Sequence, residues 1–299
     1  MASLREIRRK IKSVRSTQQI TRAMKMVSAA RMRRAQSAIL SSRPFAARLE
    51  ETVSELALME AAAAQEGEGV DHPFFERRPD ERPGLLLVTG DRGLCGAFNA
   101  NLLRAAAAWL RARQGKPVAA VLVGRKGRDF VRRLRDAGVE TLMELAGIFP
   151  KVAFKHAELA GEPLCKRFKD GRLSSVTVIY SEFKSVMVQR VVEEPLLPIP
   201  PRKESPTVGS LRAYGFKFEP DRKELLAALL PRSIKAEIYR MLLESQAAEL
   251  AARMNAMDAA TRNAGELMGY MTLELNRTRQ ALITREIAEL VGGAEALAA

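Results

Sequence analysis

The final stretch of the chain, residues 233–291, constrains the fold most strongly because it contains no proline. Apolar or small residues recur along it at alternating steps of four and three, which is the pattern of a coiled-coil seam. These positions are Leu250, Met254, Met257, Thr261, Ala264, Met268, Met271, Leu275, Thr278 and Leu282. At about 1.5 Å per residue, one helix here would be roughly 90 Å long, about three times the diameter of a small domain. We therefore expect a long helix that projects into another molecule.

A second long helix is predicted over residues 3–57. Its heptad seam holds Leu4, Ile7, Ile11 and Val14, and Met32, Ala35 and Ile39 return to that seam. Between these groups the seam positions are polar, while Ile20, Met24 and Val27 lie one or two residues out of phase. The apolar face of the helix is therefore expected to turn there. Pro44 is expected to kink or interrupt the helix.

The first helix is strongly basic. From Arg5 to Arg34 it carries eleven Lys or Arg residues and a single acid, Glu6, within a chain of net charge +14. This balance predicts an acidic partner, which could be a nucleic acid, an anionic lipid or a protein. A helix that lies on a membrane surface would need a broad face of large apolar residues, and this segment has no Trp or Phe before Phe45.

Between the two helical regions, short apolar runs alternate with helical patterns, which is typical of an α/β domain. Strands are expected at 85–89, 118–123 and 176–180, and helices at 100–113, 126–136 and 152–168. Residues 196–206 contain four prolines and should form an extended exit from the domain.

The domain organisation expected from these patterns is a coiled-coil helix over 1–59, a linker over 60–83, a Rossmann-like α/β domain over 84–215 and a second coiled-coil helix over 216–299. Asp221 and Glu224 have the spacing of a capping box. Pro231 should break the second helical region, and Gly292 with Gly293 should end it. Because the α/β insert returns the chain to its starting side, we expect the two long helices to form an antiparallel coiled coil.

Few residues suggest chemistry of their own. The Gly-rich turn at 90–96 follows the first strand of the insert, where doubly wound folds bind phosphates, but its spacing matches neither the dinucleotide fingerprint nor a Walker loop. Cys95 and Cys165 are too few for a disulfide framework or a four-ligand zinc site, and His72 and His156 have no metal-ligand spacing. We therefore expect no catalytic residue, no cofactor and no metal. The longest run without a charged residue, 93–103, is too short to span a membrane.

Three sequence blocks together resemble the gamma subunit of bacterial F-type ATP synthases. They are the pair of segments REIR (5–8) and TQQITRAMKMV (17–27), the turn DRGLCG (91–96), and residues 277–289, which include RQALIT (279–284). The resemblance covers essentially the whole chain. It implies a rotor shaft made of the two terminal helices inside a hexamer of subunits, with the α/β domain below it, near the epsilon subunit and the membrane ring. The shaft would have no chemistry of its own, and its rotation would couple proton flow to ATP synthesis and hydrolysis at the catalytic beta subunits.

The resemblance also implies partners and contact positions. The partners are an alternating hexamer of alpha and beta subunits, an epsilon subunit and a membrane ring of c subunits, with no nucleic acid. The location is the cell membrane, peripherally bound on its cytoplasmic side. The positions that match family contacts with the beta subunits are Met24, Arg253, Arg279, Gln280, Thr284 and Glu286. Residues 174–219 contain no cysteine, so the thiol regulation of the plant-type members is not expected.

Two other functions remain open at this stage. One is a basic coiled-coil protein that binds nucleic acid, because a basic region followed by heptads is also a DNA-reading layout. Against it, only 5% of the residues are aromatic and the basic helix offers none to stack on bases. The other is an α/β enzyme with helical appendages, which would need a ligand pocket at the 90–96 turn.

Overall fold

The computed structural model describes residues 3–65, 72–134, 138–149, 151–199 and 222–298. The chain divides into two compact units. Unit 1 contains residues 1–29 and 253–299, and unit 2 contains residues 30–252. Two long helices, α1 (Leu4–Gln65) and α6 (Arg222–Ala298), contribute a segment to each unit. Within the described ranges, no helix combines the length and the apolar character that a membrane span requires.

Unit 2 is built on a five-stranded sheet in the order β3-β2-β1-β4-β5. Its strands are β1 (Pro83–Val88), β2 (Val118–Val123), β3 (Val139–Leu145), β4 (Ser175–Phe183) and β5 (Gln189–Leu197). Strands β1 to β4 are parallel, and β5 joins β4 as an antiparallel edge. The remaining elements are η1 (Pro73–Phe75), α2 (Phe98–Arg111), α3 (Arg125–Arg133) and α4 (Phe154–Lys169).

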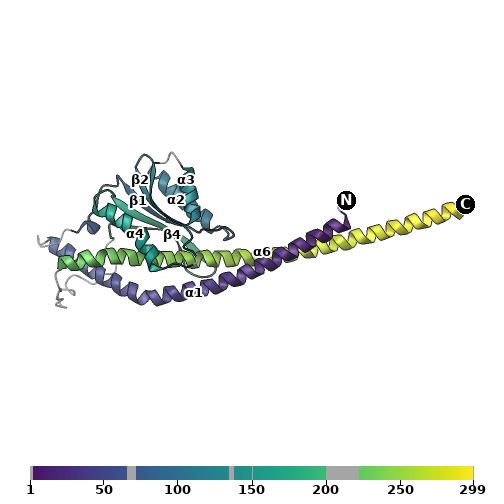
Figure 1. Ribbon diagram of the computed structural model, residues 1–299, viewed down its shortest axis with the longest axis horizontal. Coiled ribbons are helices and arrows are strands. Elements are labelled where there is room, and N and C mark those ends of the chain that lie inside the picture. Colours follow the sequence, from purple (N-terminus) through teal and green to yellow (C-terminus); the bar gives the residue numbers. More distant parts are fainter. Residues whose placement is uncertain (1–2, 66–71, 135–137, 150, 200–221, 299) are drawn as a thin grey trace. The chain divides into compact units, whose positions relative to one another are not determined.

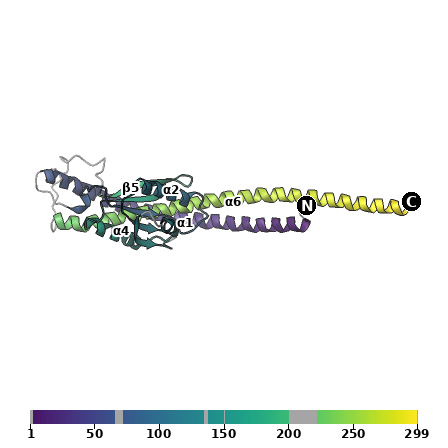
Figure 2. The same ribbon diagram turned by 90° about the horizontal axis from the view of Figure 1, so that it is seen from above.

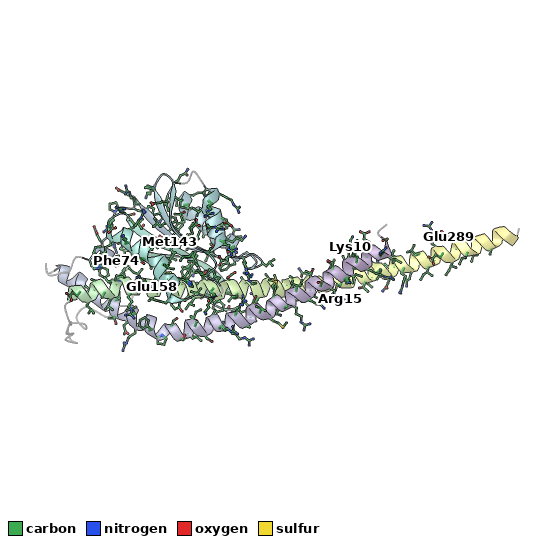
Figure 3. The ribbon with its side chains drawn as sticks, in the orientation of Figure 1. Lys10, Arg15, Phe74, Met143, Glu158 and Glu289 are labelled. Carbon is green, nitrogen blue, oxygen red and sulfur yellow. The ribbon has the colours of Figure 1, made fainter. Side chains whose placement is uncertain are left out.

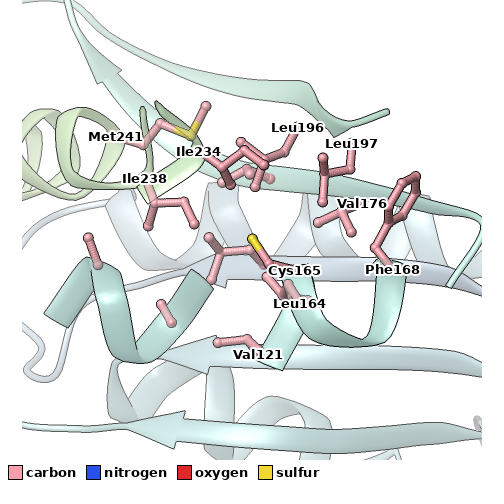
Figure 4. Packing of buried hydrophobic residues seen from close by; sticks show 14 of the residues in the cluster. Val121, Leu164, Cys165, Phe168, Val176, Leu196, Leu197, Ile234, Ile238 and Met241 are labelled. Carbon is pink, nitrogen blue, oxygen red and sulfur yellow. The ribbon is translucent and has the colours of Figure 1, made fainter. Parts of the chain in front are cut away.

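The central strands are apolar throughout because helices cover both faces of the sheet. Leu85 and Leu87 of β1 face α2, where they pack in one cluster with Leu102 and Trp109. The alternate residues of β1 belong to a second cluster, which α4 and α6 complete. In Figure 4, Ile238 and its neighbours on α6 approach the α4 side chains over the sheet. The first turns of α6 are therefore part of the core of unit 2.

The sequence located β2 to the residue and β1, β4, α2, α3 and α4 to within a few residues. It missed both edge strands. Strand β3 is only partly buried and lacks the continuous apolar run that identified β1 and β2. Strand β5 contains Pro195, which argues against a central strand but is tolerated at the edge of a sheet.

Both long helices are more continuous than predicted. Helix α1 passes through Pro44 and ends at Gln65, and α6 passes through Pro231 and through Gly292 and Gly293. A proline removes one hydrogen bond from a helix, and at Pro231 the buried neighbours Leu230 and Ile234 hold the helix in place. Glycine does not end a helix unless it adopts the left-handed cap. The proposed Asp221 cap and residues 200–221 lie outside the described residues.

In unit 1, α1 and α6 lie side by side and antiparallel, and α6 continues past the N-terminal end of α1 (Figures 1 and 2). Residue numbers fall along α1 as they rise along the facing part of α6. Lys25 contacts Asp258, and Gln18 contacts Thr261. The seam predicted from residue 250 to residue 278 is buried or half-buried throughout. The antiparallel pairing of the terminal helices is therefore confirmed.

Candidate partner-contact surface

Polar residues hold the two helices together in the middle of unit 1. The Thr21 and Thr261 hydroxyl oxygens lie 2.8 Å apart, and the Gln18 side-chain amide donates to the Thr261 carbonyl oxygen at 3.3 Å. Gln18 approaches so closely that a methyl group added at Gly265 would lie 3.1 Å from its Nε2 atom. These contacts fix the register of the two helices, since a polar pair in a coiled-coil seam is satisfied in one alignment only.

One turn further along, an ion pair closes the same seam. The Lys25 ammonium group donates to the Asp258 carboxylate, and Arg262 donates to the other oxygen of that carboxylate at 2.9 Å. The Lys25 hydrogen bond holds the pKa of Asp258 below its ordinary value. Both side chains remain partly exposed, so the pair contributes more to register than to stability.

The apolar face of α1 does not turn as predicted. Gln18, Thr21, Lys25 and Ser28 keep the heptad seam, with Thr21 and Ser28 buried. Ile20 is 58% exposed and Val27 is 50% exposed on the outer side of the helix. The prediction failed because hydrogen-bonding partners on α6 satisfy the polar seam, which leaves the apolar residues outside.

A cationic groove runs beside this polar seam. Its volume is about 430 Å³, and it is lined by Arg15, Gln18, Gln19, Arg22, Lys25, Asp258 and Thr261. Figure 3 shows Lys10 and Arg15 projecting from α1. Sequence reasoning identified the basic helix, but Gln19 and the groove itself depend on the approach of α6. The groove offers several donors for an acidic side chain or a carbonyl group.

The end of α6 has no covering in unit 1. Every residue from 279 to 294 is exposed. The stretch carries five large apolar side chains, Leu282, Ile283, Ile287, Leu290 and Val291. Leu290 is 74% exposed. Contiguous apolar side chains left on a surface are typical of a face that another protein covers.

The six contact positions implied by the resemblance all fall in unit 1. Met24 lies on α1 and is half-buried, and Arg253 on α6 is also partly buried. Arg279, Gln280, Thr284 and Glu286 are exposed on the uncovered end of α6. The Thr284 hydroxyl donates to the Gln280 carbonyl oxygen at 3.0 Å, which is a bond within the helix. The structure thus brings four of the six onto one exposed segment and leaves two nearer the paired region.

The Gly-rich turn of unit 2 is held by its own side chains. The Asp91 carboxylate accepts the backbone N–H groups of Arg125 at 3.1 Å and Gly147 at 2.9 Å. Thr89 likewise accepts the Gly127 N–H through its hydroxyl oxygen at 2.8 Å. These bonds join the turns that follow three adjacent strands, so the turn has a structural role.

Helix α6 lies directly over the same turn. A methyl group added at Gly90 would lie 3.2 Å from Oε1 of the buried Glu249 and 3.2 Å from the Asn99 side-chain oxygen. A larger residue at position 90 would therefore crowd the Glu249 side chain of α6. At the carboxyl ends of the strands, where open α/β sheets usually bind a ligand, α6 of this chain fills the space beside Gly90.

Comparison with known proteins gives consistent matches over nearly the whole chain. A family model described as ATP synthase matches residues 3–297. The chain is 44% identical to the ATP synthase gamma chain of Elusimicrobium minutum over 301 residues, which covers 99% of each chain. It is also 44% identical to the ATP synthase gamma chain of Anaeromyxobacter sp. strain Fw109-5, covering 99% of this chain and 100% of that one.

Solved structures share the fold at lower sequence identity. The rotor of the Euglena gracilis mitochondrial ATP synthase matches with a TM-score of 0.65 and 18% identity, covering 94% of this chain and 98% of the other. A chain of the central stalk and c-ring structure of the Tetrahymena thermophila mitochondrial ATP synthase matches with a TM-score of 0.59 and 24% identity, covering 81% and 99%. Both share the fold of this chain, in which an α/β domain lies between two long terminal helices in the sequence.

Proposed function

This chain belongs to the ATP synthase gamma chain family, and from that premise we propose how its two units work in the enzyme. A gamma chain is the central-stalk rotor of the F-type ATP synthase and is not its catalytic subunit. We assign unit 1 to the contact with the catalytic hexamer. We assign unit 2 to the contact with the epsilon subunit and the membrane c-ring, which rotate with the shaft.

The observation that carries this assignment is the exposed end of α6. Its apolar side chains at 282, 283, 287, 290 and 291 have no covering in unit 1. A soluble protein that left such a helix uncovered would lose the free energy of burying it, about 25 cal/mol per Å² of apolar surface. A ring of alpha and beta subunits would supply the missing surface. Apolar packing is non-directional, so it would let the helix turn inside the ring.

The polar contacts would make the interaction with the ring depend on the rotation angle of the shaft. We infer that Arg279, Gln280, Thr284 and Glu286 at the exposed end, together with Met24 and Arg253, touch the beta subunits. The cationic groove at Arg15 and Arg22 would meet acidic side chains of the same ring. Because these groups lie on particular sides of the two helices, each beta subunit would meet a different surface at each rotation angle.

Coupling then follows from differential binding. A beta subunit that alternates between open and closed states is biased toward whichever state the facing side of the shaft binds more tightly. Rotation changes the facing side, so the three sites change state in turn. The shaft needs no catalytic residue for this work.

The protein is a subunit of a membrane-associated complex, and we propose that it lies on the cytoplasmic face of the cell membrane. Its net charge of +14 would favour that side, where anionic lipids and acidic partner surfaces are close. The nucleic-acid-binding alternative receives no support from the two relatives compared above, which are both named as ATP synthase gamma chains.

A proline at Leu273 tests the shaft directly. Leu273 is exposed on α6 in unit 1, so Leu273→Ala removes little packing, whereas Leu273→Pro costs about 3 kcal/mol and kinks the helix. In vesicles that carry the assembled enzyme, Leu273→Pro should abolish proton-driven ATP synthesis, and Leu273→Ala should retain most of it. Subunit stoichiometry on a gel checks assembly. Full synthesis by the proline variant in a complete complex would overturn the rotor assignment.

A further inference from the structure

A second cavity lies on unit 2, at the opposite end of the parallel strands from the Gly-rich turn. Its volume is about 770 Å³, within the range of roughly 300–1,000 Å³ that is usual for small-molecule sites. Residues at the C-terminal ends of α2 and α3 and at the start of β2 line it, and it is open to solvent. Its apolar lining consists of Ala107, Leu110, Pro117, Val118, Phe130 and Leu134. None of these residues belongs to the proposed contacts with the hexamer.

Among the lining residues that the structure describes, the polar ones are cationic or neutral. Arg111, Arg113 and Lys116 carry the charge, and none of these described lining residues is a carboxylate. Asp80 lies just outside, 3.1 Å from the Lys116 ammonium nitrogen and 3.7 Å from Nε of Arg113. Asp80 therefore pairs with two of the three cations, and the described residues at the cavity keep a net positive charge beside an apolar surface.

Arg113 is already positioned by its neighbours. Its guanidinium carbon lies 4.0 Å from the centroid of the Trp109 ring, and Nη1 donates to the Trp109 carbonyl oxygen at 3.4 Å. Its Nε atom is buried and makes no hydrogen bond within the described part of the chain. An arginine that is held in place on an aromatic ring loses little conformational entropy when it binds an anion.

Stabilisation of the α2 C-terminus accounts for only part of this arrangement. Cations near a helix C-terminus interact favourably with its free carbonyl groups, and Arg111 donates to the Ala107 carbonyl oxygen at 3.2 Å. That role explains the charges. It does not explain an adjoining apolar cavity in which Phe130 and Leu134 of the α3 end remain only partly buried.

We propose that this cavity binds a small amphipathic anion. The apolar body would lie against Leu110, Phe130 and Leu134, and a carboxylate, sulfonate or phosphate head would reach Arg111, Arg113 and Lys116. Either a free organic acid or the headgroup region of an anionic lipid offers this chemistry. The proposal is independent of the rotor function, because it concerns the isolated chain.

The chain has a built-in reporter, since Trp109 is its only tryptophan and stacks on Arg113. The probe is 8-anilinonaphthalene-1-sulfonate. The control is N-phenyl-1-naphthylamine, which has the same apolar body without the sulfonate. We expect saturable quenching of Trp109 fluorescence by the sulfonate. Arg111→Gln combined with Lys116→Gln should weaken sulfonate binding about tenfold and change the binding of the uncharged probe less than twofold. Equal weakening of both probes, or no effect on either, would overturn the anion assignment.

Two alanines on α2 give a matched test of the cavity itself. Ala107 lines it and Ala108 is exposed one residue away. Ala107→Phe should fill the space and weaken the sulfonate probe at least tenfold, while Ala108→Phe should leave it within twofold. Circular dichroism checks that each variant is folded. Equal affinities in the two variants would show that the probe binds elsewhere and would refute the proposal.

Competition distinguishes the two sources of the ligand. Decyl phosphate below its micelle concentration should displace the probe if the site takes a free amphiphile, and decanol should not. Displacement by phosphatidylglycerol vesicles, but not by decyl phosphate, would assign the site to a lipid headgroup. Displacement by decanol as readily as by decyl phosphate would contradict an anion site.

Discussion

Arg240 on α6 holds Glu194 on β5, with guanidinium Nη2 3.3 Å from carboxylate Oε1. The same guanidinium donates to Glu237 through Nε at 2.9 Å and to Glu244 through Nη1 at 2.9 Å. The Tyr180 hydroxyl of β4 donates to the second oxygen of Glu194 at 2.8 Å. One cation therefore joins the helix that enters the shaft to the two strands at the edge of the sheet.

Arg240→Met should weaken this junction strongly. The change leaves three carboxylates close together without their cation, and because the group is partly buried the cost should lie at the low end for buried ion pairs, about 3 kcal/mol. The expected fall in melting temperature of the isolated chain is roughly 5–10 °C. Arg240→Lys keeps the charge and should recover part of the loss. Differential scanning calorimetry compares the three proteins, and equal stability of the methionine variant would show that the network contributes nothing.

Glu244 predicts a dependence of stability on pH. Burial raises the pKa of Glu244, although Arg240 acts in the opposite direction, and its buried Oε2 atom accepts no hydrogen bond from the described residues. The native state thus holds this proton more tightly than the unfolded chain does. The free energy of unfolding must fall as pH rises from the unfolded pKa of about 4.3 to the raised native pKa.

Glu244→Gln removes that dependence, because the amide stays neutral and can still accept from Arg240. The variant should match the original protein near pH 4 and exceed its stability at pH 8. Urea unfolding at both values measures the difference, with Glu193→Gln as an exposed control on β5. A stability gain that is larger at pH 4 than at pH 8 would contradict the assignment.

Arg279→Gln tests the proposed contact with the beta subunits. If the guanidinium binds a carboxylate or carbonyl group of the ring, its loss should remove about 1–2 kcal/mol of contact free energy and lower proton-driven ATP synthesis roughly 5- to 30-fold. Arg277→Gln is the matched control, since Arg277 is also exposed and lies two positions earlier on α6. The rates of the two variants in assembled vesicles should therefore differ, and equal rates would remove Arg279 from the contact set.

Asp91→Ala should destabilise unit 2 without uncoupling the enzyme. The Asp91 carboxylate accepts two backbone N–H groups from other turns, and both hydrogen bonds are lost in the alanine variant. The expected cost is therefore about 2–3 kcal/mol. Asp91→Asn keeps one acceptor oxygen and should lose less than half of that. Chemical denaturation measures stability, and ATP synthesis by the assembled complex should remain largely intact in both variants.

The two cysteines should be unreactive in the folded protein. Cys95 and Cys165 are both buried, and burial raises the pKa of the Cys165 thiol to about 11. At pH 8 only about one Cys165 in a thousand is then a thiolate, which is the nucleophilic form. Labelling by a disulfide reagent should be slow until denaturant is added, and dithiol reductants should leave the rate of the assembled enzyme unchanged. Rapid labelling of the native chain would show that a thiol is accessible.

Periodicity in the sequence was enough to predict the two long helices, their antiparallel pairing and the central strands. Continuous apolar runs such as 118–123 can be buried on both faces only in a covered parallel sheet. The four-and-three spacing of the seam from Leu250 to Thr278 fixes which side of α6 meets α1. These features depend on the spacing of residues that are close together in the chain, and that spacing can be read from the sequence.

Tertiary structure decided the features in which a residue depends on a distant partner. The seam continues through Gln18 and Thr21 because Thr261, some 240 positions away, accepts a hydrogen bond from Gln18 and shares one with the Thr21 hydroxyl. Arg240 acquires its carboxylates from β5 as well as from its own helix. A polar side chain can be buried when a residue from another helix or strand forms a hydrogen bond with it. The residues next to it in the sequence do not show whether such a partner exists, so its burial depends on the tertiary structure.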